Sequence, residues 1–100
     1  MADARAAALA ALLHVDENEG FSNLVLDKTL AQFALEPRDA ALASAIFYGV
    51  LERRLTLDYY IGQFASIPIR KMSPQVREIL RIGAYQILYL EKVPPSAAVN

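Results

Sequence analysis

The residues of this sequence best suited to a chemical role are basic, and most of them lie in its second half. Guanidinium and ammonium groups bind phosphate, so a surface that gathers them can hold a nucleic-acid backbone. Seven such residues are candidates for RNA contact: Arg5, Arg53, Arg54, Arg70, Lys71, Arg77 and Arg81. Whether they share one face depends on how the chain packs.

Several of these basic residues also have a purely structural explanation. Arg53 and Arg54 close a predicted helix, where a cation favours the negative end of the helix dipole. Arg77 and Arg81 lie four residues apart on another predicted helix, and Glu78 is placed to pair with Arg81. Capping, ion pairing and phosphate binding therefore all stay open for this set.

Residue patterns typical of catalysis or metal binding do not occur in the sequence. There is no cysteine, which excludes disulfides, thiolate metal sites and cysteine nucleophiles. The single histidine, His14, has no candidate nucleophile near it in sequence. Asp16, Glu17 and Glu19 lack the alternation and the glycine of a calcium loop, and no P-loop, GxGxxG or HExxH motif is present. We expect no catalytic residue, metal or cofactor within these 100 residues.

Aromatic side chains offer a second way to bind RNA, because unpaired bases stack on them. The tyrosines are Tyr48, Tyr59, Tyr60, Tyr85 and Tyr89. They recur at helical spacing beside many aliphatic residues, which favours positions in or at the rim of a hydrophobic core.

The charge of the chain is unevenly distributed. The net charge is -1, but residues 1–39 carry -4 and residues 40–100 carry +3, so positive potential is expected only in the second part. A separate RNA-binding protein is usually more basic, whereas a domain that binds RNA as part of a larger molecule can be this neutral.

Membrane insertion and export are not expected. The longest stretch without a formal charge, Ala40 to Leu51, has twelve residues, whereas a membrane-spanning helix needs roughly 20. Asp3 and Arg5 interrupt the alanine-rich start, which also lacks the basic region of a signal peptide. We expect a cytoplasmic protein with no membrane partner.

The helix that must position the basic residues is predicted over 73–90, with Ser73 as N-cap and Pro74 as its first residue. One face is apolar and is predicted to be buried: Val76, Ile79, Leu80, Gly83, Ile87 and Leu90. A narrow polar strip is predicted to reach the surface: Gln75, Arg77, Glu78, Arg81 and Gln86. Glycine costs roughly 1 kcal/mol in a helix interior, so Gly83 indicates that another backbone passes close to it.

Four further helices precede this central one. Apolar periodicity predicts helices over 2–16, from Ser22 or Asn23 to about 33, from Pro37 to about 54, and over 57–65. Thr56 is the expected cap of the fourth helix, with Leu55 and Tyr60 forming a hydrophobic staple.

The two remaining segments are a connection and a chain end. Pro68 favours an extended path through 66–72, and Pro94 and Pro95 end the central helix before a new one begins near Ser96. The fold class is therefore all-α, with about five helices and a truncated sixth in a single domain over 1–100. We expect this domain to continue past Asn100.

Several short motifs in a fixed order then carry a family resemblance. They are Leu35-x-x-Arg38-Asp39-x-Ala41-Leu42-Ala43, Tyr48-Gly49-Val50-Leu51, Leu57-Asp58-Tyr59, Lys71-Met72-x-Pro74-x-Val76-Arg77, Leu80-Arg81-x-Gly83-x-Tyr85-Gln86 and Val93-Pro94-x-x-Ala97-Ala98-Val99-Asn100. Together they resemble the NusB-like helical domain, in the version found at the N-terminus of the Sun/RsmB family of bacterial ribosomal RNA cytosine-C5 methyltransferases.

This resemblance implies a non-catalytic domain that binds ribosomal RNA and helps to position it as a substrate. A methyltransferase domain that uses S-adenosylmethionine would follow outside these residues and would be a partner of this one. Two alternatives stay open: a stand-alone NusB-type antitermination factor with a ribosomal protein partner, and a helical protein-interaction module that does not contact RNA. In NusB factors the first helix is arginine-rich, whereas here it holds only Arg5.

Overall fold

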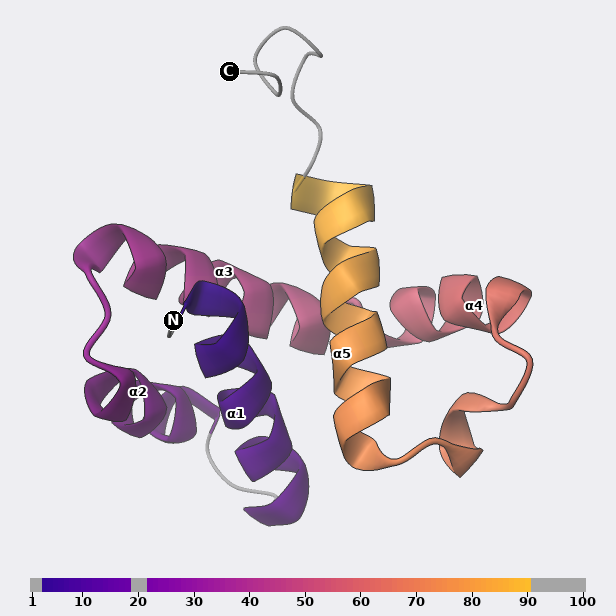
Figure 1. The fold of residues 1–100 in the computed structure, drawn as a ribbon, viewed down its shortest axis with the longest axis horizontal. Coiled ribbons are helices and arrows are strands. Elements are labelled where there is room, and N and C mark those ends of the chain that lie inside the picture. Colours follow the sequence, from indigo (N-terminus) through magenta and orange to yellow (C-terminus); the bar gives the residue numbers. More distant parts are fainter. Residues whose placement is uncertain (1–2, 19–21, 91–100) are drawn as a thin grey trace, which may run out of the picture.

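The computed structural model describes residues 3–18 and 22–90 and confirms the all-α class (Figure 1). The helices are α1 (Ala4–Asn18), α2 (Ser22–Phe33), α3 (Pro37–Glu52), α4 (Arg54–Phe64) and α5 (Pro74–Tyr85). A 3-10 turn, Ile69–Lys71, precedes α5, and a π-helical turn, Gln86–Leu90, continues it. The described residues contain no strand. The sixth helix expected near Ser96 lies outside the described residues.

The core forms where α1 and α3 meet α5. Alanines on α1, among them Ala7, Ala8 and Ala11, are fully buried and let this helix approach α2, α3 and α5 closely. From α3, Ile46 and Phe47 are fully buried, which confirms the prediction that this helix is a core element. Burial of such side chains contributes roughly 1.5–3 kcal/mol each.

The predicted start of the central helix is confirmed. The Ser73 hydroxyl accepts a hydrogen bond from the Val76 backbone N–H at 3.3 Å, and Pro74 is the first helical residue. Pro37 likewise begins α3. The Ser73 cap supplies a partner for a backbone N–H group that has no acceptor inside the helix, whereas Pro37 has no N–H that needs one.

The predicted start of the fourth helix is wrong. Only Arg53, with φ -113° and ψ 21°, separates α3 from α4, so α4 begins at Arg54 and Thr56 lies inside it. Leu55 is 86% exposed and forms no hydrophobic staple with Tyr60. The reason is that the chain turns within one residue, which leaves no room for the expected capping segment.

The connection between α4 and α5 is extended at Pro68, as predicted, but then tightens into the turn Ile69–Lys71. The Lys71 N–H donates to the Pro68 carbonyl at 2.9 Å, and the Met72 N–H donates to the Ile69 carbonyl at 3.0 Å. Buried Met72 fixes this turn against the bundle. No helix in the described ranges is long and apolar enough to cross a membrane.

The predicted centre of the bundle is confirmed, because α5 contacts α1, α3 and α4 (Figure 1). Its predicted orientation is wrong. The side chains that α5 buries are Glu78, Arg81, Ile82 and Tyr85, two of which were expected at the surface. At about 100° per residue, this buried stripe lies roughly 150° around the helix from the predicted apolar face. Burial of the two charges is possible because Arg81 pairs with both Glu78 and Asp58.

The apolar face of α5 is consequently open to solvent. The large side chains of this face that are at least a third exposed are Val76, Ile79 and Leu80 on α5 and Ile87 in the turn that continues it. Helix periodicity identified this face correctly as apolar, but among the described residues no element covers it.

The glycine at the close helix crossing is Gly49 and not Gly83. A Cβ atom on Gly49 would overlap the ring of Tyr85, so α3 can approach α5 only where α3 has no side chain. A Cβ atom on Gly83 would have no described atom within 4 Å. The predicted close approach at Gly83 is therefore absent from the part of the chain that the structure describes.

Candidate nucleic-acid interface

Three of the predicted basic residues meet in one hollow between α4, the turn Ile69–Lys71 and α5. This hollow, which we call the arginine notch, has a volume of about 490 Å³. Its lining residues are Asp58, Gly62, Ile69, Arg70, Arg77 and Arg81. The first half of α5 and the adjoining turn thus bring together cations that are up to eleven residues apart in sequence.

Arg81 forms the buried wall of the notch. Its Nε and Nη2 donate to the two carboxylate oxygens of Asp58, each at 2.8 Å, and its Nη1 donates to Glu78 at 2.8 Å. Burial by itself would lower the pKa of this guanidinium, but the hydrogen bond to Asp58 and the charges of Glu78 and Asp58 outweigh it and raise the pKa. Arg81 therefore stays charged, and all three of its nitrogens are already engaged.

Arg77 and Arg70 also line the notch, and neither guanidinium is held by a carboxylate in the described residues. The Nη2 of Arg77 donates to the Met72 carbonyl at 3.0 Å, which holds the half-buried side chain in place. The Nε of Arg77 is buried and has no hydrogen-bond partner among the described residues. Arg70, on the turn Ile69–Lys71, also lines the notch and is exposed, and Lys71 is exposed beside it in sequence. An anion in the notch would therefore lie near donors from α5 and from this turn.

The other candidate cations lie elsewhere. Arg5, on α1, donates through Nε to Gln86 Oε1 at 3.1 Å. Arg53, at the junction of α3 and α4, lies 3.7 Å from a Glu52 oxygen, and its guanidinium carbon is 4.5 Å from the centroid of the Tyr89 ring. Arg54 is half-buried in the first turn of α4. The seven candidates do not form one continuous group.

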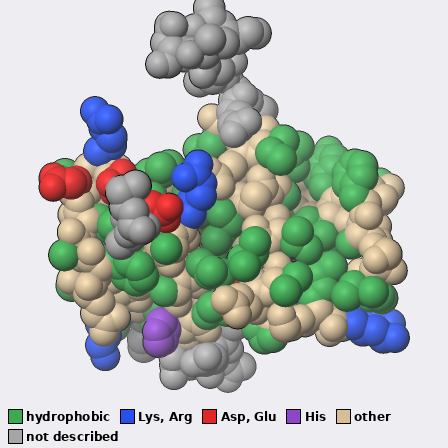
Figure 2. All heavy atoms as spheres, viewed as in Figure 1, with side chains coloured by type: hydrophobic (Ala, Val, Ile, Leu, Met, Phe, Trp, Pro, Cys, Tyr) green, Lys and Arg blue, Asp and Glu red, His purple; other side chains and the backbone are tan. Residues whose placement is uncertain are grey.

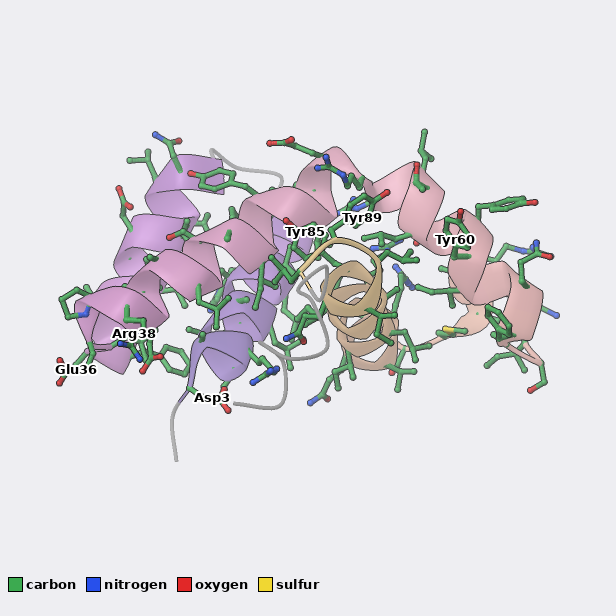
Figure 3. All side chains as sticks on the ribbon, turned by 90° about the horizontal axis from the view of Figure 1, so that it is seen from above. Asp3, Glu36, Arg38, Tyr60, Tyr85 and Tyr89 are labelled. Carbon is green, nitrogen blue, oxygen red and sulfur yellow. The ribbon has the colours of Figure 1, made fainter. Side chains whose placement is uncertain are left out.

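The tyrosines divide between the core and the surface. Tyr85 of α5 and Tyr89 of the turn Gln86–Leu90 stack with their centroids 5.4 Å apart and point toward the junction of α3 and α4, whereas Tyr60 lies out along α4 (Figure 3). Tyr59 is exposed on α4 beside Tyr60, and the two rings meet edge to face at 5.7 Å. The core or rim positions expected from the sequence are confirmed for Tyr85 and Tyr89.

A second, larger hollow is apolar and was not predicted. This α4–α5 groove has a volume of about 630 Å³ and is lined by ten uncharged residues: Tyr60, Ile61, Phe64, Ala65, Ile79, Leu80, Gly83, Ala84, Ile87 and Leu88. Figure 2 shows hydrophobic side chains gathered over α5 and α4 on this face. The groove offers contact area for apolar groups and no partner for phosphate.

Sequence analysis missed the pairing of Asp58 with Arg81 and the exposure of the groove. Asp58 follows buried Leu57 and lies 23 residues from Arg81, so no local spacing marks the pair. Within the described ranges, no group of three or more His, Asp or Glu side chains is placed to hold a metal ion.

Comparison with known proteins identifies the family. Residues 2–100 match the NusB family model. The chain therefore belongs to the NusB family. No solved structure matches this NusB-family chain significantly.

Methyltransferases and antitermination proteins are both among the relatives of this NusB-family chain. It is 37% identical, over its whole length, to a probable ribosomal RNA small subunit methyltransferase B from Synechocystis, and 36% identical, over 93% of its length, to one from Bacillus subtilis. It spans only 22% and 21% of these two proteins, matching their N-terminal portions. It is 28% identical to the transcription antitermination protein NusB of Desulforamulus reducens, of which it spans 68%.

Proposed function

We propose that this chain is the RNA-binding domain of a small-subunit ribosomal RNA cytosine-C5 methyltransferase and that it positions the RNA without taking part in catalysis. The methyltransferases that it resembles are several times longer, which leaves room for a catalytic domain in the same protein. S-adenosylmethionine would bind in that domain, because the described residues of this chain contain no strand and no glycine-rich loop to hold it. Such a protein would act in the cytoplasm, where ribosomal RNA is found.

The observation that carries this proposal is the arginine notch. Arg70 and Arg77 line a hollow large enough for a phosphate group, and guanidinium groups donate charge-assisted hydrogen bonds to phosphate oxygens. Arg81 would contribute its positive charge and hold the wall of the notch in place, since Asp58 and Glu78 already accept hydrogen bonds from its nitrogens. Phosphate contacts of this kind position RNA and read no sequence.

The test is the salt dependence of binding to a small-subunit ribosomal RNA fragment. The variant Arg70→Gln/Arg77→Gln should bind roughly tenfold more weakly, and the slope of log K against log salt should become shallower by roughly 1 for each phosphate that the variant no longer neutralises. Arg38→Gln is the matched control, because Arg38 is exposed at the far end of α3 (Figure 3). Equal affinities and slopes for the three proteins would refute the proposal.

A stand-alone antitermination factor is the second candidate, and the match to NusB proteins supports it. Such a factor would bind a ribosomal protein together with RNA through a basic first helix, but α1 offers one arginine only, Arg5. The gene sequence past Asn100 decides between the two. A stop codon within roughly 40 codons would favour the factor, and a long open frame would favour the methyltransferase.

A further inference from the structure

The arginine notch contains a carboxylate that phosphate binding alone does not need. Three arginines and Asp58 line the notch, and a carboxylate repels the phosphate that the arginines attract. The Asp58 side chain is 26% exposed, so a molecule bound in the notch can reach its oxygens. A ligand that suits the whole notch therefore offers a hydrogen-bond donor as well as an anion.

The oxygens of Asp58 can accept more hydrogen bonds than the protein supplies. An ionised carboxylate has about four acceptor sites on its two oxygens. Arg81 occupies one site on each oxygen, through its Nε and Nη2 at 2.8 Å. Because these two bonds also fix the plane of the carboxylate, the remaining acceptor sites have a set direction before a ligand arrives.

Gly62, one turn after Asp58 on α4, leaves the helix backbone bare beside this carboxylate. Residues four apart lie on the same face of a helix, and both of these line the notch. A glycine within a helix costs roughly 1 kcal/mol compared with alanine, yet a Cβ atom on Gly62 would meet no described atom within 4 Å. Packing among the described residues therefore does not explain this glycine, whereas close approach of a ligand to the backbone would.

The notch is larger than a phosphate group needs. Its volume of about 490 Å³ equals that of roughly sixteen water molecules at about 30 Å³ each, which leaves room for a sugar beside the phosphate. Arg77 precedes Arg81 by one turn of α5, a rise of about 6 Å. In RNA the 2′-hydroxyl is on the carbon next to the one that carries the 3′-phosphate. One ribonucleotide thus offers an anion for Arg77 and, close to it, a donor for Asp58.

We propose that the notch holds one ribonucleotide of the RNA backbone and that Asp58 accepts a hydrogen bond from its 2′-hydroxyl. The phosphate lies against Arg70 and Arg77, and the ribose lies against the bare backbone at Gly62. Asp58 makes the notch selective for ribose over deoxyribose, because the 2′-hydroxyl is the group by which a protein distinguishes RNA from DNA. This inference rests on the proposed function, in which the notch binds the RNA backbone.

The test changes the sugar of the ligand and leaves the protein intact, because Asp58 also holds Arg81 in place. The probes are a single-stranded oligouridylate of about ten nucleotides, its 2′-deoxy counterpart and its 2′-fluoro counterpart. The 2′-fluoro sugar keeps the pucker of ribose but has no proton to donate. Fluorescence anisotropy with the whole protein at low salt should show the ribose probe binding roughly tenfold more tightly than each of the others.

Two variants locate this preference in the notch. Asp58→Asn leaves one acceptor oxygen, which Arg81 occupies, and should reduce the preference for ribose to less than about twofold. Gly62→Leu should do the same, because its side chain would take the place of the sugar, while the open space around it spares the fold. Gln63→Leu is the matched control, because Gln63 is the next residue of α4, is exposed and does not line the notch. Its preference for ribose should be unchanged.

NMR gives a local readout of the same contact. The side-chain carboxyl carbon of Asp58 should shift when the oligouridylate is added and should not shift when the 2′-fluoro probe is added. This measurement needs no substitution, so it tests the contact even where Asp58→Asn fails to fold. A shift of equal size with both probes would contradict the hydrogen bond.

Three binding results would overturn the inference. They are equal affinities for the three probes, a 2′-fluoro probe that binds as tightly as the ribose probe, and a preference for ribose that survives in both variants. In each case, weaker binding by Arg70→Gln/Arg77→Gln would still uphold the proposed function. Binding that is unaffected by this double substitution would refute the proposed function itself.

Discussion

The guanidinium of Arg81 on α5 and the carboxylate of Asp58 on α4 form two parallel hydrogen bonds of 2.8 Å. This bidentate pair joins the two helices that enclose both the arginine notch and the α4–α5 groove. Glu78, fully buried one turn earlier on α5, accepts a hydrogen bond from the third guanidinium nitrogen. The site and the core of the second half of the bundle therefore share one ionic network.

Removal of Arg81 should destabilise the chain strongly. Arg81→Met removes the guanidinium that is hydrogen-bonded to buried Glu78 and to Asp58, and we expect the free energy of unfolding to fall by about 3–5 kcal/mol in urea titrations. Because the folded-state pKa of Arg81 is raised, the stability that this group contributes is present at neutral pH and is lost only in strongly alkaline solution. Arg38→Met, at an exposed arginine, should change stability by less than about 0.5 kcal/mol. A loss at Arg81 no larger than at Arg38 would contradict the network.

The two helix glycines Gly49 and Gly83 should respond oppositely to alanine in the 100-residue chain. Gly49→Ala would force a methyl group into the Tyr85 ring and should lower the unfolding free energy by about 1–3 kcal/mol. Gly83→Ala meets open space and should raise it by up to about 1 kcal/mol. Thermal denaturation of both variants measures the contrast. Similar losses at both positions would show that α5 packs differently from the structure.

Two leucines of α4 offer a test of the observed helix start. Leu57 is fully buried, so Leu57→Ala should lower the unfolding free energy by about 2–5 kcal/mol. Leu55 is exposed, so Leu55→Ala should change it by less than about 0.5 kcal/mol. Urea titration of the two variants distinguishes this arrangement from the hydrophobic staple that the sequence suggested. In the staple, Leu55→Ala would also lower the unfolding free energy.

The Ser73 cap should make a modest contribution. Ser73→Ala removes the acceptor for the Val76 N–H and should lower the unfolding free energy by about 1 kcal/mol, whereas Ser73→Gly should cost only a few tenths. Amide hydrogen exchange at Val76 reports on the same bond and should be faster in the alanine variant. Unchanged exchange there would mean that water replaces the hydroxyl with no penalty.

The RNA contact surface can be mapped by NMR titration with a ribosomal RNA fragment. Shifts should be largest at Arg70, Lys71 and Arg77, which border or adjoin the notch, and smaller at Arg5 and Arg53, which lie outside it. High salt should reverse these shifts, because phosphate contacts release counterions. Shifts confined to α2 would indicate a different surface.

The sequence by itself determined the helices and much of what ends them. Ser73 and Pro74 act through the nearest backbone groups, and apolar residues at helical spacing mark α3 and α5 as core elements. These signals are local, so they survive in the fold. The motifs also carried the family resemblance, which the match over residues 2–100 confirms.

Only the tertiary structure decided which face of α5 is buried. Periodicity shows that a face is apolar but not whether a partner covers it, and no local pattern linked Asp58 to Arg81 across 23 residues. The same holds for the glycines, because close approach at Gly49 depends on where Tyr85 of another helix lies. Contacts between residues far apart in the chain set these features, and those contacts exist only once the helices have packed.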